Sequence, residues 1–330
     1  MTASPPSFTA KIGFLRGLCT ADDEAIETHF AWVFLIGAYA VKLRKPVRRG
    51  TMDYGSLEAR RLGALAELRL NLPLAPEVYL EVVPLTVLSD GRLAVGGEAS
   101  PCDWLVRMRR LDRGRFLDAL LTRGADVEAA LAGVARRLAD FYRDAAAAPL
   151  DGPGFLARLR HQVAANHRVL DDAGVPGANR LCAQQDGFIA SRSTLLADRA
   201  TSGCVVEAHG DLRPEHIFLG TPPAVIDRLE FDRDLRTLDR AEELSFLELE
   251  CARIRQAAVG QRLRRDCLAA LGDAAPPALL AFYRSHRAAT RAKLYVWRSQ
   301  EPDGDTPETW IDRARSYLGD ALAEAAQLSP

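Results

Sequence analysis

The hydrophobic pattern near the start of the chain predicts a β-hairpin. Two short apolar runs, residues 32–36 and residues 39–43, flank a two-residue turn, and apolar runs around a tight turn are typical of paired antiparallel strands. Successive side chains of a strand point to opposite faces of the sheet. Lys42 is therefore expected to point away from the face that its two apolar neighbours occupy.

The next segments predict one helix and two more strands. Ser56 opens a stretch in which apolar and charged residues recur at spacings of three and four, as in an amphipathic helix, and this stretch ends before Pro73. Residues 78–88 and 103–108 have the pattern of strands. We interpret residues 1–10 as a loose tail.

From residue 111 onward the pattern is mainly helical. Helical periodicity covers residues 116–122, 127–146, 155–170 and 179–199, and helices resume near residue 240. Short strand-like runs interrupt the helices at residues 205–208, 217–219 and 224–226. The chain therefore predicts an α+β fold. A small β-rich N-terminal lobe would comprise residues 1–108, and a larger, mostly helical C-terminal lobe would comprise residues 109–330.

Composition and charge narrow the class of protein. Of the 330 residues, 48% are hydrophobic and 26% are charged, which excludes bulk disorder. The formal net charge of −1 provides no general positive field for nucleic acid. The longest apolar run, residues 30–41, is shorter than the ~20 residues of a membrane span, and residues 1–10 lack the features of a signal peptide. The six cysteines are scattered, so we expect no disulfide framework and a cytoplasmic protein. From the charge and the short apolar run we expect no nucleic-acid and no membrane partner. Its oligomeric state stays open.

The strongest candidate chemistry lies between residues 205 and 232. A strand leads into His-Gly-Asp-Leu at residues 209–212, and His216 follows on a short strand. A turn connects this strand to a second one, which ends in Asp227. We expect this hairpin to bring the loop of Asp211 and Asp227 to the same end. Mg²⁺ is usually held by one or two carboxylates, so the pair suits a divalent cation and a catalytic base.

His-Gly-Asp-Leu, followed by Ile-Asp with Asp227 placed 16 residues after Asp211, resembles the aminoglycoside phosphotransferase and choline kinase branch of the protein-kinase-like fold. The strand with Lys42, the following helix and the hinge-like residues 104–108 agree with that resemblance. The segments at residues 27–35, 67–80 and 209–217 resemble an uncharacterised bacterial subfamily of aminoglycoside-phosphotransferase-like proteins. The resemblance covers about residues 25–255 and implies a two-lobed kinase-like fold, with ATP and Mg²⁺ as cofactors.

The resemblance implies roles for the matching charged residues. Asp211 would be the base or orienting group for the acceptor hydroxyl, and Asp227 would hold Mg²⁺ on the ATP phosphates. Lys42 would contact the α- and β-phosphates. A helix carboxylate would pair with Lys42, either Glu67, which we favour, or Glu58.

The same resemblance implies supporting roles elsewhere. Residues 108–111, including Met108 and Arg110, would offer backbone groups to adenine. His209 would brace the catalytic loop, and Asp239 would cap a helix without binding a ligand.

Two departures from the family pattern bear on the metal and phosphate sites. His216 stands where kinases of this fold place an Asn that binds a second Mg²⁺, and imidazole is a poor Mg²⁺ ligand. Either that metal site is weakened, or an oxygen of Glu230 or Asp232 replaces it, or His216 carries a proton. The chain has no Gly-x-Gly-x-x-Gly motif, so residues 27–31 would cover the phosphates with backbone amides and the Thr28 hydroxyl.

Several other groups have two interpretations. The basic runs at residues 42–49 and 107–115 are solvated faces or attract an anionic ligand. The aromatic residues Tyr283, Tyr295 and Trp297 pack the C-terminal helices or line an acceptor pocket. Four glutamates near the expected acceptor side either suit a polycation or form an ordinary glutamate-rich helix face: Glu242, Glu243, Glu248 and Glu250.

The leading functional hypothesis is an ATP- and Mg²⁺-dependent phosphotransferase that moves the γ-phosphate to a hydroxyl of a small molecule. The alternative is a nucleotide-binding pseudokinase without turnover, which His216 and the missing glycine-rich loop favour. A third interpretation takes His209, Asp211 and His216 as the transition-metal site of a hydrolase. The acceptor stays open among sugars, amino alcohols, nucleosides and protein hydroxyls.

Overall fold

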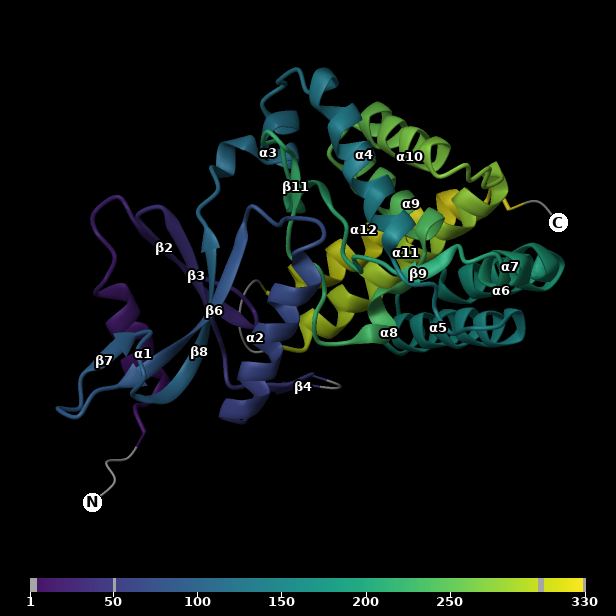
Figure 1. Cartoon of the computed structure of the whole chain (residues 1–330). Helices are drawn as coiled ribbons and strands as arrows, with labels where there is room; N and C mark the ends of the chain where they lie inside the picture. Colours follow the sequence, from purple (N-terminus) through teal and green to yellow (C-terminus); the bar gives the residue numbers. More distant parts are fainter. Residues whose placement is uncertain (1–4, 50–51, 302–305, 329–330) are drawn as a thin grey trace. The chain divides into compact units, whose positions relative to one another are not determined.

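The computed structural model describes residues 5–49, 52–301 and 306–328 (Figure 1). The chain divides into two compact units. The first unit comprises Met1–Ala130 and Glu215–Arg236, and the second comprises Leu131–Pro214 and Thr237–Pro330. The first unit is therefore discontinuous, because a segment from the later part of the chain returns to complete it.

The first unit is built on a six-stranded antiparallel sheet. The strands follow the order β1-β2-β3-β8-β6-β7. Their bounds are β1 Glu24–Glu27, β2 Ala31–Ile36, β3 Tyr39–Arg44, β8 Ser100–Arg109, β6 Tyr79–Val87 and β7 Leu93–Val95. The pairing of β2 with β3 is the hairpin that the apolar pattern predicts, with Val33 opposite Lys42.

Helices α1 (Phe8–Arg16) and α2 (Leu57–Asn71) lie on opposite faces of this sheet (Figure 1). Leu15 of α1 joins Val41 and Leu43 in one core cluster. Ala64 of α2 joins Tyr79 and Val106 in another. The alternation of the strands thus buries the neighbours of Lys42 beneath one face and directs Lys42 toward α2.

Short elements complete the first unit. They are β4 Arg48–Arg49, β5 Met52–Asp53, η1 Arg113–Arg115, α3 Leu117–Thr122, β10 Ile217–Phe218, β11 Ala224–Val225 and α8 Arg233–Arg236. The turn η2 (Pro214–His216) leads from the second unit into the first. The strands β10 and β11 form an antiparallel hairpin in which Ile217 faces Val225.

The second unit is mostly helical. Its helices are α4 Glu128–Asp144, which begins in the first unit, α5 Gly152–Asp172, α6 Ala178–Ser191, α7 Ser193–Thr201, α9 Arg240–Arg253, α10 Ala257–Ala270, α11 Pro277–Ser299 and α12 Pro307–Ala325. Two short strands, β9 (Val205–Glu207) and β12 (Thr237–Asp239), pair antiparallel. Every residue of α9 from Ala241 to Cys251 is buried, so this helix is the core element of the unit. None of the helices in the described ranges is long and apolar enough to cross a membrane.

The sequence-based expectations for the main elements hold, with the following differences. The loose tail expected over residues 1–10 is wrong for residues 8–10, because α1 begins at Phe8, capped by the Ser7 side chain; residues 1–4 lie outside the described residues. The helix expected over residues 179–199 is broken at Arg192. The strands β1 and β7 were not predicted. The α+β class is confirmed, whereas the lobe boundary between residues 108 and 109 stays a prediction.

Candidate active site

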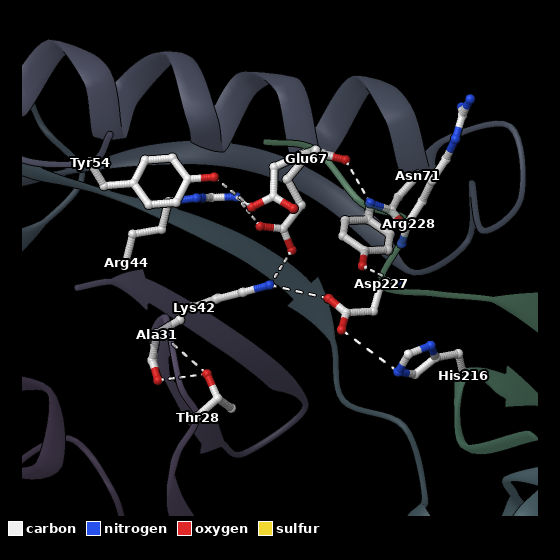
Figure 2. Close-up of polar contacts among 12 residues, drawn as sticks. Thr28, Ala31, Lys42, Arg44, Tyr54, Glu67, Asn71, His216, Asp227 and Arg228 are labelled. Atoms are coloured by element: carbon white, nitrogen blue, oxygen red, sulfur yellow. Dashed lines mark hydrogen bonds and ion pairs between the residues drawn. The ribbon is translucent and has the colours of Figure 1, made fainter. Parts of the chain in front are cut away.

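Lys42 lies at the centre of a polar network in the first unit. Its Nζ is 2.9 Å from Glu67 Oε1 and 3.3 Å from Asp227 Oδ1 (Figure 2). Burial lowers the pKa of Lys42, but the carboxylates of Glu67, Asp227 and Glu230 outweigh burial and raise it well above its ordinary value. The amine is therefore a fixed positive charge at neutral pH.

The partner of Lys42 is Glu67 and not Glu58. Helix α2 begins after Ser56, whose side chain accepts a hydrogen bond from the Ala59 amide. Three turns later the Glu67 side chain is buried. Glu58 lies 63% exposed and pairs with Arg61 on the same helix, so the structure decides between the two carboxylates.

Arg44 is a member of this network that sequence reasoning missed. Its guanidinium is 1% exposed, binds Glu67 Oε2, and donates to Glu230 Oε1 at 3.0 Å. The Tyr54 hydroxyl donates to the same Glu230 oxygen at 3.0 Å. The interpretation of residues 42–49 as a solvated face is therefore wrong for Arg44. Its position two residues after Lys42, on the same face of β3, was the available signal.

Asp227 is held in a left-handed backbone conformation, with φ 63°. Its amide donates to the Tyr79 hydroxyl at 3.1 Å, and the next amide, of Arg228, donates to Asn71 Oδ1 at 2.9 Å. Figure 2 shows this segment against the end of α2. These contacts fix the Asp227 backbone while its side chain stays 53% exposed. Tyr79 and Asn71 gave no chemical signal in the sequence.

His216 and Asp227 are brought together by the β10–β11 hairpin. The Ile226 amide donates to the His216 carbonyl at 2.9 Å, and His216 Nε2 lies 3.8 Å from Asp227 Oδ2 (Figure 2). An imidazole thus flanks one carboxylate oxygen and Lys42 flanks the other. The roles of His216 as metal ligand or proton carrier stay predictions.

The residues present fit a Mg²⁺ ion that is shared with a bound nucleotide. Mg²⁺ prefers hard oxygen ligands and usually takes one or two carboxylates together with substrate phosphates and water. The half-exposed carboxylate of Asp227 provides such a ligand. Glu230, the other expected ligand, already accepts from Arg44 and Tyr54. Within the described ranges no cluster of three or more His, Cys, Asp or Glu could hold a metal ion, so the hydrolase interpretation gains no support.

Thr28 and Arg110 make contacts that stabilise turns. The Thr28 hydroxyl donates to the Ala31 carbonyl at 2.8 Å and accepts from the Ala31 amide (Figure 2). Arg110 Nη1 donates to Asp23 Oδ1 at 2.9 Å, and the Arg110 amide donates to the Ala38 carbonyl. Backbone hydrogen bonds from Thr20 and Gly37 hold the pKa of Asp23 at about 2.

Met108 lies on β8 opposite Ala40 and packs at the edge of the core cluster beneath α2. The nucleotide-binding roles expected for Thr28, Met108 and Arg110 stay predictions.

In the second unit, the loop with His209 and Asp211 is anchored on one buried carboxylate. Glu243 of α9 accepts hydrogen bonds from the amides of His209 and Gly210, and from the Tyr142 hydroxyl at 2.6 Å. Burial raises the pKa of Glu243, and these hydrogen bonds offset part of that effect. His209 is fully buried, and its Nδ1 accepts from the Asp211 amide at 3.3 Å. This contact supports the bracing role expected for His209.

Two arginines of α11 lie against the same loop. Arg287 Nη2 donates to the Gly210 carbonyl at 2.9 Å, and Arg291 Nη1 is 3.8 Å from Asp211 Oδ1. Neither was expected from the sequence. Their spacing of four places them on one face of the helix, which was the only signal available.

The four glutamates expected at an acidic acceptor surface are all buried. Glu242 pairs with His286, and Glu243 holds the loop. Glu248 binds Arg264 and Arg284, and Glu250 binds Arg213 and Tyr317. The four glutamates therefore form neither an acidic acceptor surface nor a solvated helix face, because each carboxylate is already bound inside the unit.

Asp239 is a helix cap, as expected. Its side chain accepts from the Ala241 amide at the start of α9. It also accepts from Arg199 and from the Tyr283 hydroxyl at 2.7 Å. Tyr283 accordingly packs inside the helical unit, and Tyr295 stacks on Trp310.

No family model matches the chain. An uncharacterized protein of Mycobacterium tuberculosis is 34% identical over 299 residues, which cover 88% of this chain and 58% of that protein. An uncharacterized protein of Mycobacterium bovis matches with the same values. The chain thus spans less than two thirds of the length of the curated relatives that it matches.

Solved structures match almost the whole chain. The GDP complex of aminoglycoside 2'-phosphotransferase-IIIa has a TM-score of 0.54 at 16% identity, and the match covers 96% of this chain and 99% of that one. The GDP and kanamycin complex of APH(2")-IIIa has a TM-score of 0.54 at 15% identity, with 96% and 97% covered. A choline/ethanolamine kinase family protein from Mesorhizobium loti has a TM-score of 0.52 at 15% identity, with 93% and 92% covered. The chain therefore has the kinase-like fold that aminoglycoside phosphotransferases and choline/ethanolamine kinases share.

Proposed function

We propose that this protein is an ATP- and Mg²⁺-dependent phosphotransferase that moves the γ-phosphate onto a hydroxyl of a small molecule. The observation that carries the proposal is the position of Lys42 between the buried carboxylate of Glu67 and the half-exposed carboxylate of Asp227. Phosphoryl transfer depends on positioning and on neutralisation of phosphate charge. A fixed cation beside a carboxylate suited to Mg²⁺ supplies both.

Each residue then has one task in the first unit. Lys42 binds the α- and β-phosphates, and Glu67 orients its amine. Asp227 would hold Mg²⁺, which neutralises phosphate charge when bound. The contacts of the Asp227 and Arg228 amides with Tyr79 and Asn71 keep that carboxylate in place.

In the second unit, Asp211 accepts the proton of the acceptor hydroxyl. The acceptor oxygen forms a bond to the γ-phosphorus, the bond from that phosphorus to the bridging oxygen breaks, and ADP leaves with the electron pair. Glu243 accepts from the two amides before Asp211, and the His209 ring accepts from the Asp211 amide itself, so these two side chains fix the backbone that leads to this carboxylate. A positioned base of this kind contributes about 10²–10⁴-fold to rate.

Nucleotide binding tests the first-unit half of the proposal. Calorimetry with ATP, with and without Mg²⁺, is applied to the wild type, Asp227→Asn and Glu58→Gln. Asn tolerates the left-handed backbone of position 227, so this variant removes the charge without backbone strain. We expect tighter ATP binding with Mg²⁺ in the wild type and in Glu58→Gln, and no Mg²⁺ effect in Asp227→Asn. A wild type that binds no nucleotide overturns the proposal.

A nucleotide-binding module without turnover is the second candidate. The observation that favours it is His216, whose Nε2 lies 3.8 Å from Asp227 Oδ2, at the position where the family resemblance implies an Asn that binds metal. Measuring ADP release from ATP, with small alcohols as acceptors, separates the phosphotransferase from the binding module. An enzyme loses turnover by about 10²-fold or more in Asp211→Asn and keeps nucleotide binding. A binding module binds nucleotide and shows no turnover that this variant could remove.

A further inference from the structure

Helix α11 presents a row of positive charges to the loop that carries Asp211. Arg287 binds the Gly210 carbonyl, and Arg291, one turn further, lies 3.8 Å from the Asp211 carboxylate. A distance of 3.8 Å is an ion pair without a hydrogen bond. Nη1 of Arg291 therefore lies next to Asp211, the expected catalytic base, without a hydrogen bond to it.

The buried part of Arg291 has donor capacity that the protein does not use. Its Nη2 donates to the Tyr295 hydroxyl at 3.3 Å, and its guanidinium lies 5.3 Å from the Tyr295 ring centre. Within the described ranges the buried Nε of Arg291 has no hydrogen-bond partner. The Nε of Arg287, a residue that is more than nine-tenths buried, has none there either. Buried donors without partners are costly and rare in native proteins. These two Nε groups are closed to solvent, so a ligand would be bound by the terminal Nη1 of Arg291, which lies 3.8 Å from Asp211 Oδ1.

Lys293 adds a third cation. Its amine lies 5.2 Å from the Trp297 ring centre, and no ion pair with a carboxylate is formed among the residues that the structure describes. Burial, and then the charge of Arg287, lower the pKa of Lys293 to about 8. At neutral pH this amine is still mostly protonated, so α11 carries a third positive charge, within electrostatic reach of Arg287.

Each glutamate of α9 has a hydrogen-bond or ion-pair partner of its own. Glu243 and Glu250 of α9 bind the loop, Arg213 and Tyr317. The remaining α9 glutamates pair with His286, Arg264 and Arg284. The groups of α11 that contact the Asp211 loop are guanidiniums, those of Arg287 and Arg291, and their counter-charges are Asp211 itself and the buried glutamates of α9. Guanidinium groups beside Asp211 are unfavourable for a polycation and favourable for an oxyanion.

We propose that the acceptor is a small hydroxyl compound that carries a carboxylate or phosphate group, and that Arg291 binds this group. The planar guanidinium matches carboxylate and phosphate oxygens in a two-pronged geometry. Anchoring the anionic end on Arg291 would leave the hydroxyl of the same molecule beside Asp211. The proposal rests on the proposed phosphotransferase function. The proposed anionic acceptor differs from kanamycin, the compound that accompanies GDP in the structure of APH(2")-IIIa.

Binding of matched small molecules tests the proposal. The probes are glycerate and glycerol 3-phosphate as anions, glycerol as the neutral form, and ethanolamine and kanamycin as cations. Calorimetry is run with and without Mg²⁺-ADP on the wild type, Arg291→Ala and Arg291→Lys. Arg298→Ala is the matched control, because Arg298 lies on the same helix and pairs with Glu301.

We expect at least one anion to bind about ten-fold or more tightly than glycerol. This preference disappears in Arg291→Ala, is reduced in Arg291→Lys, and is kept in Arg298→Ala. The ratio of glycerate to glycerol 3-phosphate affinity then identifies carboxylate or phosphate as the recognised group.

Equal binding of glycerol and the anions, absence of anion binding, or tighter binding of ethanolamine or kanamycin overturns the proposal. Loss of ATP affinity in Arg291→Ala with ADP affinity unchanged also overturns it, because Arg291 would then serve the transferred phosphate. Nucleotide binding by the wild type is measured in the same series, so a failure of the phosphotransferase function is recognised separately from a failure of anion selectivity.

Discussion

The buried guanidinium of Arg44 binds the oxygen of the Glu67 carboxylate opposite to the one that faces Lys42. Arg44 also donates to Glu230, three residues after Asp227. One side chain thus joins β3, α2 and the segment that carries the proposed metal ligand. This arrangement gives Glu67 a second cation besides Lys42.

Replacing Arg44 with Met should destabilise the first unit. The variant leaves two carboxylates without their shared cation, and removing one partner of a buried pair costs about 3–5 kcal/mol. In this variant Glu67 still pairs with Lys42, and Glu230 still accepts from Tyr54. We therefore expect the free energy of unfolding, measured by urea denaturation, to fall by about 2–3 kcal/mol. Arg61→Ala breaks an exposed pair on α2 and should cost less than about 1 kcal/mol. Equal losses in the two variants would contradict the prediction.

Glu243→Gln should slow turnover without abolishing nucleotide binding. A Gln side chain has one acceptor oxygen and one donor group, so at least one loop amide, of His209 or Gly210, would lose its acceptor. We expect turnover to fall by about 10²-fold, comparable with the loss of one well-placed catalytic interaction. Tyr142→Phe removes only the hydroxyl donor to Glu243 and should have a smaller effect. Unchanged turnover in Glu243→Gln would exclude this positioning role.

The backbone at position 227 should favour glycine over alanine. Because φ is 63° there, Asp227→Ala places a β-carbon in the left-handed region, whereas Asp227→Gly does not. We expect the Gly variant to be about 1 kcal/mol more stable than the Ala variant in chemical denaturation. The reverse order would mean that the backbone of Asp227 relaxes when its side chain is lost.

Lys293→Met should stabilise the protein at neutral pH. The folded pKa of about 8 lies below the ordinary value of 10.5, so the folded state disfavours the charged amine. The depressed pKa lowers the free energy of unfolding by its full amount below pH 8. The free energy of unfolding recovers as the pH rises from 8 to 10.5. We expect the Met variant to gain about 2 kcal/mol at pH 7 and to match the wild type above pH 10.5. A gain that is constant between pH 7 and pH 10 would instead reflect packing alone.

The parts of the site that follow from local pattern were predictable from the sequence. Period-two alternation on β3 places Lys42 away from the core, and three-and-four spacing places Glu67 on one face of α2. The strand-turn-strand pattern after residue 216 places His216 beside Asp227. Each inference needs only neighbouring residues, because short-range geometry fixes which way a side chain points.

The anchors of the site were not predictable, because they depend on contacts between distant segments. Glu243 is one of several glutamates on α9, and such a helix is typical of a solvated surface. Its role appears only when α9 packs beneath a loop that lies 33–34 residues earlier. Arg291 lies 80 residues after Asp211, and nothing in its local sequence distinguishes it from Arg298 on the same helix.

The discontinuity of the first unit affects how it is made. Domains generally fold from the N-terminus during synthesis, at about 5–20 residues per second. Asp227 follows Lys42 by 185 residues. The ribosome therefore needs roughly 10–40 s after adding Lys42 to reach Asp227. In that interval the second unit is already being synthesised, although the first is unfinished. A chain released before residue 215 would carry Lys42 and Glu67 without Asp227, and the exposed end of α2 would make it a substrate for chaperones and proteases.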